Sequence, residues 1–113
     1  MSESYKARRI FHFAASAKLN HMHSGGLCTN RGAVGAITLT LPPGAEGLDI
    51  RVVAIADHDI TVDPDGTDIL NDIGVPLVAG QYQKIDDVGG ELHYIHDGTS
   101  WCHLYERGTI TNE

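Results

Sequence analysis

Short segments of alternating apolar and polar residues, separated by turn residues, dominate the chain from residue 33 to its end. In residues 35–41 the apolar side chains Ile37, Leu39 and Leu41 alternate with threonines, and residues 48–55 begin with the same period of two. Such alternation predicts a strand with one buried face and one face toward water. We predict further strands at 60–62, 68–70, 82–86, 91–96 and 100–105. Turn residues recur about every eight to twelve positions, a spacing typical of a β-sandwich or barrel.

We therefore predict an all-β fold, an antiparallel β-sandwich of the jelly-roll type with an extended N-terminal arm. The length of 113 residues fits one domain. Residues 6–14 are aromatic and β-branched enough to form a strand. We assign residues 1–17 to a basic arm or strand and residues 18–113 to the sandwich. Strands and helices do not alternate and no glycine-rich phosphate loop occurs, which excludes the parallel-sheet nucleotide enzymes.

The charge is distributed unevenly along the chain. Residues 1–31 contain five basic residues and one acidic residue, a net charge of +4, whereas residues 32–113 contain three basic and fourteen acidic residues, a net charge of −11. The overall charge of −7 disfavours nucleic acid and anionic membranes as partners. A basic segment before an acidic body is typical of an arm that docks on another protein, although a solvated N-terminus explains it equally well. Because no apolar run approaches the ~18 residues of a membrane helix, we expect a soluble protein made in a cytosol.

An aspartate-rich turn is the first candidate metal site. Asp63, Asp65 and Asp68 surround the tight turn at Gly66. Carboxylate-rich turns of this kind can bind calcium, but the spacing is not that of an EF-hand. An ordinary turn, in which aspartates cap their own backbone, is the simpler interpretation.

Histidine and cysteine side chains form the second candidate metal site. His21, His23 and Cys28 have the donor types of a zinc site, and Cys102 with His103 adds two more. The spacing matches no zinc motif. If residues 21–23 form a strand, the two histidines share one face, which suits chelation and an ordinary polar face alike. We expect no cofactor.

No catalytic constellation stands out. Cys102 and His103 are neighbours, but adjacent strand residues point to opposite faces, and His93 and His96 are likewise expected on opposite faces. Cys102 is better explained as a small buried hydrophobic residue. It lies 74 positions from Cys28, so the chain forms at most one disulfide, and we expect reduced thiols. The sequence predicts no enzyme.

Three aromatic residues near the end of the chain allow a second kind of site. Trp101, Tyr94 and Tyr105 are close enough in sequence to form an aromatic platform for a sugar. The alternative, which we favour, is that Trp101 anchors the core from the last hairpin.

Several segments together resemble a β-domain that recurs in tailed-bacteriophage virion proteins. Residues 18–26 precede a turn of the form Asn-x-Gly-Ala at Asn30–Ala33, and that turn leads into a threonine-alternating strand that ends in Leu-Pro. The stretches 60–69 and 97–101 are similar to the later hairpins of the same module. The resemblance covers about residues 18–105.

This resemblance implies a capsid decoration (cement) protein, which binds the outer surface of the assembled head as a trimer and stabilises it. The implied partners are the major capsid protein and further copies of the chain, without nucleic acid or membrane. Its location would be the virion surface after synthesis in the bacterial cytoplasm. Candidate capsid-binding residues in the arm are Lys6, Arg8, Arg9, Ile10, Phe11 and Phe13. The alternatives are a tail-fibre, spike or head-fibre adhesion domain that binds host-surface glycan, and a carbohydrate-binding sandwich unrelated to phage.

Overall fold

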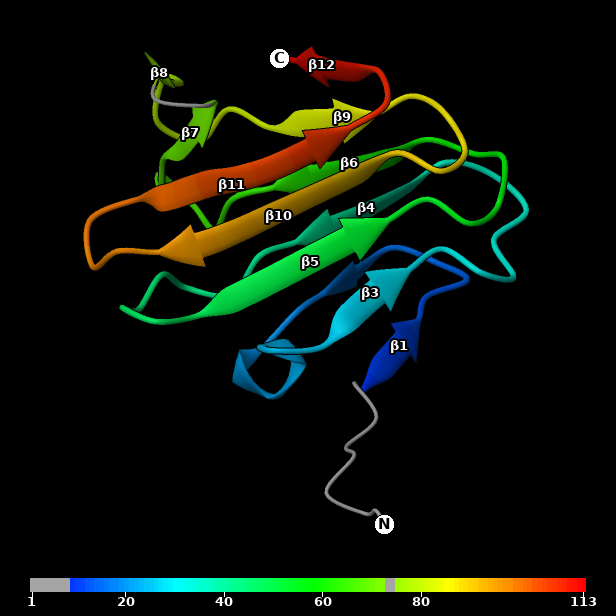
Figure 1. Cartoon of the computed structure of the whole chain (residues 1–113). Coiled ribbons are helices and arrows are strands. Elements are labelled where there is room, and N and C mark those ends of the chain that lie inside the picture. The colour runs from blue at the N-terminus through cyan, green and yellow to red at the C-terminus, as the bar shows by residue number, and fades with distance from the viewer. Residues whose placement is uncertain (1–8, 73–74) are drawn as a thin grey trace, which may run out of the picture.

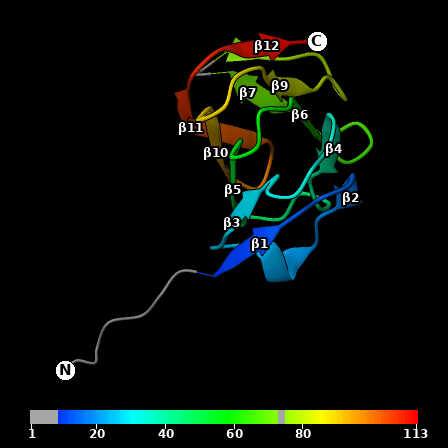
Figure 2. The same cartoon turned by 90° about the vertical axis from the view of Figure 1, so that its right-hand side faces the viewer.

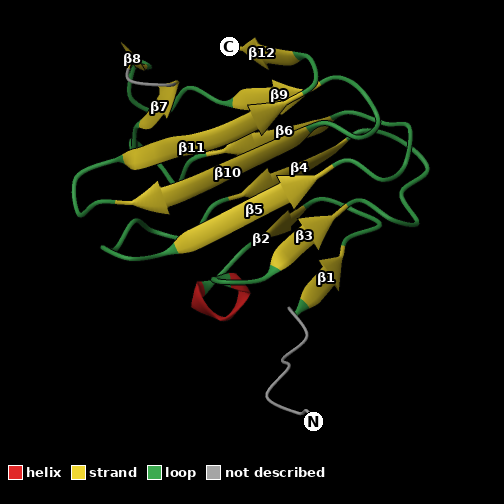
Figure 3. Cartoon of the chain, viewed as in Figure 1, coloured by secondary structure: helices red, strands yellow, loops and turns green. Residues whose placement is uncertain are grey.

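The computed structural model describes residues 9–72 and 75–113, which form two β-sheets packed face to face (Figures 1 and 3). The seven-stranded sheet A contains, in spatial order, β1 (Ile10–His12), β3 (Leu27–Thr29), β5 (Asp49–Val53), β10 (Glu91–His96), β11 (Trp101–Arg107), β7 (Leu70–Asp72) and β8 (Val75–Pro76). The five-stranded sheet B contains β12 (Ile110–Asn112), β9 (Gln83–Ile85), β6 (Ile60–Asp63), β4 (Ile37–Thr40) and β2 (Ala17–Lys18). One short 3₁₀ helix, η1 (His21–His23), follows β2. The predicted all-β sandwich is confirmed.

The first half of the chain winds as a flattened solenoid. Strands β1 to β7 alternate between the two sheets, and within each sheet β1, β3 and β5, or β2, β4 and β6, run parallel. In sheet B, Leu39 pairs with Ala17 of the previous turn and with Val62 of the next. The sheets are therefore mixed rather than wholly antiparallel as predicted. Alternation indicates which side chains are buried, but it does not indicate which strand lies alongside.

The second half of the chain extends both sheets, mostly through antiparallel pairs. The β10–β11 hairpin lies between β5 and β7, and β9 and β12 extend sheet B beyond β6. Asp97 and Gly98 form the hairpin turn, as the sequence predicted. The Asp97 carboxylate accepts hydrogen bonds from the backbone N–H groups of Thr99 and Ser100, and Gly98 adopts φ of 99°. These carboxylate contacts lower the pKa of Asp97 below its usual value.

The core lies between the sheets and consists of the inward-facing residues of the alternating strands. Leu39 and Val52 are among its fully buried members, and each such side chain contributes roughly 1.5–3 kcal/mol relative to an exposed one. Trp101 is also fully buried, and its ring is nearly perpendicular to the His96 ring, with 5.0 Å between the centroids. This confirms Trp101 as an anchor of the core.

The described part of the predicted arm belongs to the sandwich. Strand β1 pairs in parallel with β3, which places Phe11 opposite Cys28, and both Phe11 and Phe13 pack against the core. The predicted strand over residues 6–14 spans only Ile10–His12, and residues 6–8 lie outside the described residues. The proposed boundary after residue 17 therefore does not separate an arm from the domain, because Phe11 of β1 and Phe13, just after the strand, bury apolar surface there. No helix within residues 9–72 and 75–113 is long and apolar enough to cross a membrane.

Candidate functional site

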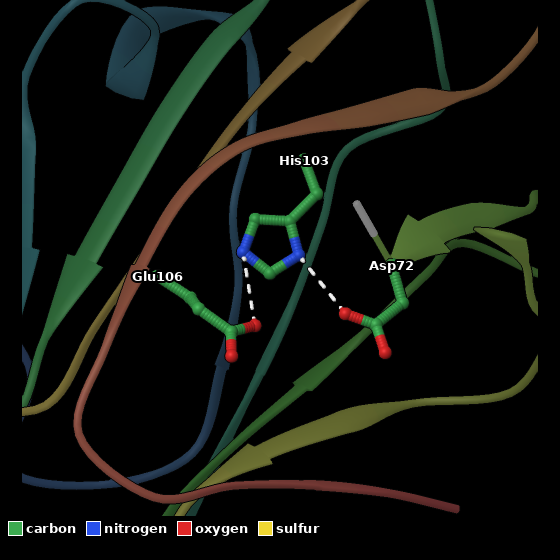
Figure 4. Close-up of side chains that lie close together, drawn as sticks. All are labelled: Asp72, His103 and Glu106. Atoms are coloured by element: carbon green, nitrogen blue, oxygen red, sulfur yellow. Dashed lines mark ion pairs between the residues drawn. The ribbon is translucent and has the colours of Figure 1, made fainter. Parts of the chain in front are cut away.

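A cluster of ionisable side chains lies between β7 and β11, far across sheet A from β1 (Figures 1 and 4). His103 Nδ1 lies 3.6 Å from Asp72 Oδ1, and His103 Nε2 lies 3.5 Å from Glu106 Oε1. The imidazole is fully buried, whereas about a third of each carboxylate side chain is exposed (30% and 31%). Among the described residues, this is the one group in which three His, Cys, Asp or Glu ligand atoms lie within 4.8 Å of one another.

A β-bulge places Glu106 on the same side of β11 as His103. Tyr94 pairs with His103 but His93 pairs with Tyr105, so Leu104 is an extra residue in the strand. Residues three positions apart on a regular strand point to opposite faces, and the extra residue reverses that relationship. Leu104 and Tyr105 are consequently both exposed, and the strand resumes with Glu106 opposite the buried Leu92 of β10.

A chain of hydrogen bonds connects this cluster to sheet B. Asn112 of β12 donates from Nδ2 to Asp72 Oδ2 at 2.8 Å, and Gln83 of β9 donates from Nε2 to Asn112 Oδ1 at 2.8 Å. The Tyr94 hydroxyl donates to Gln83 Oε1. Burial raises the pKa of Tyr94 well above 10, and the negative charges of Asp72 and Glu106 raise it further. The phenol therefore stays a neutral donor.

One hydrogen bond of His103 places a hydrogen on Nε2. Nε2 lies 3.0 Å from the carbonyl oxygen of Tyr105, which can only accept, so Nε2 carries a hydrogen. Nδ1 has no hydrogen-bond partner among the described residues, nor does Glu106 Oε1, although both atoms are buried. Unsatisfied buried polar atoms are rare in proteins, so this pair calls for an explanation.

The predicted grouping of His21, His23 and Cys28 does not form. The two histidines lie on η1 rather than on a strand. His23 accepts a hydrogen bond from the Asn20 backbone at Nδ1 (2.9 Å), and its ring packs against Phe11 at 4.7 Å between centroids. Cys28 is fully buried in the core, where desolvation raises the pKa of its thiol to about 12. His23 thus closes the end of the solenoid.

The predicted calcium turn is not assembled either. Asp65 forms a 2.6 Å ion pair with Lys18 of the neighbouring β2, and Asp68 accepts a 2.9 Å hydrogen bond from the backbone of Gly44. Asp63 belongs to β6, where burial and then the charge of Glu113 raise its pKa. Each carboxylate faces a different neighbour, so the three do not converge on one point.

The predicted opposite orientation of Cys102 and His103 is confirmed, but the predicted burial of Cys102 is wrong. The two side chains do point to opposite faces, but His103 is buried and Cys102 faces outward, where its thiol donates to Asp97 Oδ2 at 3.4 Å. Trp101 sets this register because its large ring occupies the core. His93 and His96 also lie on opposite faces, as predicted. Both cysteines are free thiols.

The predicted aromatic platform for a sugar does not exist on the surface. Trp101 and Tyr94 are fully buried, and of the three residues only Tyr105 is exposed. A sugar-binding platform needs neighbouring aromatic rings with exposed faces, and these three side chains do not provide them.

The second candidate site is the outer edge of β1, the end strand of sheet A (Figure 2). Phe13 donates from its backbone N–H to Thr29, and the Arg9 carbonyl accepts from Leu27, both at 2.9 Å. Because alternate residues of a strand bond to alternate sides, the backbone groups of Ile10 point away from β3. Those of His12 do the same, and no described strand pairs with this edge.

The side chains beside this edge are basic and apolar. Ile10 is 54% exposed. The Arg9 guanidinium lies 5.5 Å from the centroid of the Phe11 ring and donates to the Ser24 carbonyl at 3.2 Å. Of the predicted arm residues, Phe11 and Phe13 are partly buried, while Lys6 and Arg8 lie outside the described residues.

No protein-family model matches the chain, and no curated protein is significantly similar to it in sequence. Function is therefore proposed from the resemblance and the geometry.

Proposed function

We propose that this protein is a bacteriophage capsid decoration (cement) protein, which binds the outside of the assembled head as a trimer and stabilises the shell. The observation that carries the proposal is the outer edge of β1. The resemblance of residues 18–105 to a virion β-domain supplies the class of partner, the major capsid protein.

The β1 edge has the properties of a docking strand. Its outward N–H and C=O groups at Ile10 and His12 can pair with an extended segment of a partner, and such β-augmentation gives affinity through backbone hydrogen bonds. Soluble proteins usually protect an edge of this kind, because it also promotes aggregation. An edge strand that carries an exposed isoleucine therefore favours a protein with a partner.

The distribution of charge supports an orientation in which the β1 end of the protein faces the capsid. The excess of basic residues lies in residues 1–31, which include β1, whereas residues 32–113 carry a net charge of −11. With the β1 end against the capsid, the acidic body faces solvent, where like charges keep virions apart.

Stabilisation follows from mass action. A protein that binds the assembled shell and not the free subunits lowers the free energy of the shell, by about 2.7 kcal/mol per site at a concentration 100 times the Kd. Three linked edges in a trimer add avidity, and three-fold symmetry suits the local three-fold positions of an icosahedral lattice.

A proline substitution at Ile10 tests the edge directly. Ile10→Pro removes an N–H that points away from β3, so the β1–β3 pairing persists while the docking edge is blocked. Ile10→Ala is the matched control, because it removes the same side chain and keeps the N–H. We expect Ile10→Pro to weaken binding to undecorated heads at least about tenfold, and Ile10→Ala to weaken it much less.

Circular dichroism must first show that both variants are folded. Equal capsid binding by a folded Ile10→Pro variant and the unmodified protein would contradict docking through the β1 edge. The adhesion-domain alternative loses its main support, because Trp101 and Tyr94 are buried.

A further inference from the structure

We propose that Asp72, His103 and Glu106 form a binding site for one divalent transition-metal ion, for which Zn²⁺ is the probe. The site lies at the β7 side of sheet A, whereas the proposed docking edge is β1 at the other side, so the two proposals are independent.

The charge of the cluster favours a cation. Two carboxylate groups flank a fully buried imidazole ring, and together they carry a charge of −2 when both are ionised and the ring is neutral. Among the described residues no lysine or arginine forms an ion pair with Asp72 or Glu106, and the groups that face the cluster from sheet B are the neutral amides of Asn112 and Gln83. Water screens part of this charge, because about a third of each carboxylate side chain is exposed, and a divalent ion would neutralise the rest.

The distance between His103 Nδ1 and Asp72 Oδ1 fits a shared metal ion. At 3.6 Å the two atoms are too far apart for a hydrogen bond. They are too close for a bridging water, which needs a hydrogen-bond length on each side. Two ligands bonded to tetrahedral zinc at 2.0–2.2 Å lie about 3.3–3.6 Å apart.

The surrounding hydrogen bonds orient these two atoms as metal ligands are oriented. A metal-binding histidine usually donates its other ring N–H to a carbonyl or carboxylate, and His103 Nε2 donates to the Tyr105 carbonyl at 3.0 Å. The second oxygen of Asp72 is held by Asn112 at 2.8 Å. The atom left without a partner on His103 is thus the one that faces Asp72.

Glu106 is the third candidate ligand. Its Oε1 lies 3.5 Å from His103 Nε2, whereas Asp72 faces the other ring nitrogen (Figure 4). This buried oxygen also lacks a hydrogen-bond partner and lies within 4.8 Å of a ligand atom of each of the other two residues, so the carboxylate must turn toward Asp72 to bind the same ion as Nδ1. One imidazole with two carboxylates suits zinc or another first-row ion better than calcium or magnesium, which prefer oxygen alone.

Such an ion would link two strands of sheet A directly and β12 of sheet B through a hydrogen bond. Asp72 belongs to β7, His103 and Glu106 to β11, and Asn112 links the site to β12 of sheet B. Metal binding to the folded chain would therefore raise its thermal stability.

Calorimetric titration of the full chain with Zn²⁺ tests the site, with Co²⁺ absorption as a second readout of the ligands. We expect one ion per chain, a higher Tm with zinc, and visible Co²⁺ bands. Glu106→Gln and Asp72→Asn should each weaken binding about 10- to 100-fold and His103→Gln should weaken it at least as much.

His58→Gln is the matched control. His58 is an exposed histidine flanked by Asp57 and Asp59, so it offers the same residue types without burial. We expect this variant to bind zinc as tightly as the unmodified chain. If His103→Gln fails to fold, Asp72→Asn decides, because it changes one atom on the partly exposed side chain that faces Nδ1.

The proposal is overturned if the chain binds no zinc, or if the bound ion is lost in His58→Gln and kept in folded Asp72→Asn. Calcium binding that is unaffected by substitution at His103 also contradicts it.

Discussion

The Tyr94 hydroxyl of sheet A donates a hydrogen bond to the side-chain carbonyl of Gln83 in sheet B, and both side chains are fully buried. The two sheets are thus joined by a polar contact inside the core. Buried hydrogen bonds contribute little when made but cost much when half of the pair is removed.

Tyr94→Phe is expected to lower the free energy of unfolding by about 1–3 kcal/mol, because Gln83 Oε1 stays buried without its donor. Gln83→Met should lower the free energy of unfolding less when it is added to Tyr94→Phe than when it is made in the unmodified protein. Urea denaturation of both single variants and the double variant measures this coupling. Additive losses would mean that the two side chains do not interact.

Gly44 is required by close packing against His96. A Cβ at Gly44 would lie 2.6 Å from His96 Cδ2 and closer still to Nε2, and the His96 ring is held against Trp101. Gly44→Ala should therefore destabilise the protein by about 1–3 kcal/mol. Gly35→Ala is the control, because a Cβ there meets nothing within 4 Å. Urea denaturation should show little loss or a small gain for Gly35→Ala, and equal losses in the two variants would contradict this packing.

Stability should fall in alkaline solution. Burial raises the pKa of the Cys28 thiol from 9.0 to about 12 and that of Tyr94 well above 10. Above pH 9.0 the unfolded chain releases the Cys28 proton while the folded chain keeps it, so the free energy of unfolding decreases with pH. The slope from one group is at most about 1.4 kcal/mol per pH unit.

Cys28→Ala isolates the thiol contribution. Between pH 9.0 and 10.0 the free energy of unfolding of Cys28→Ala should change less than that of the unmodified protein. Tyr94 contributes to the pH dependence only at higher pH. Urea denaturation in reducing buffer at a series of pH values measures both curves. Parallel curves for the two proteins would show that the Cys28 thiol is not shielded from solvent.

Trp101 should behave as a core residue in solution. Its fluorescence should be blue-shifted and resistant to acrylamide quenching, because the ring is fully buried. Titration with host-surface glycans should leave the emission unchanged, with Tyr105→Ala as a check on the one exposed ring of the predicted platform. A saturable response that Tyr105→Ala abolishes would favour the adhesion-domain alternative.

Alternation in the sequence was sufficient to predict the main strands and the buried faces. The predicted strands at 35–41, 48–55 and 91–96 contain β4, β5 and β10, and the Asp97-Gly98 turn joins β10 to β11. The parallel winding of the first half was not predictable in this way. The pairing of Leu39 with Ala17 and Val62 depends on the path of the chain between sheets, which local periodicity does not encode.

The candidate metal cluster was only partly accessible from sequence. His103 was recognised as a ligand type, but strand alternation places Glu106 on the opposite face. The bulge at Leu104 reverses this, and nothing in the local sequence marks it. Asp72 reaches the cluster through a parallel pairing of β7 with β11, another long-range contact.

The most direct test of the proposed function is sedimentation of the purified protein alone and mixed with undecorated phage heads. The decoration proposal predicts a compact trimer that co-sediments with the heads at saturating stoichiometry, and loss of co-sedimentation in folded Ile10→Pro. A protein that is folded but stays in the supernatant with intact heads would contradict the proposal.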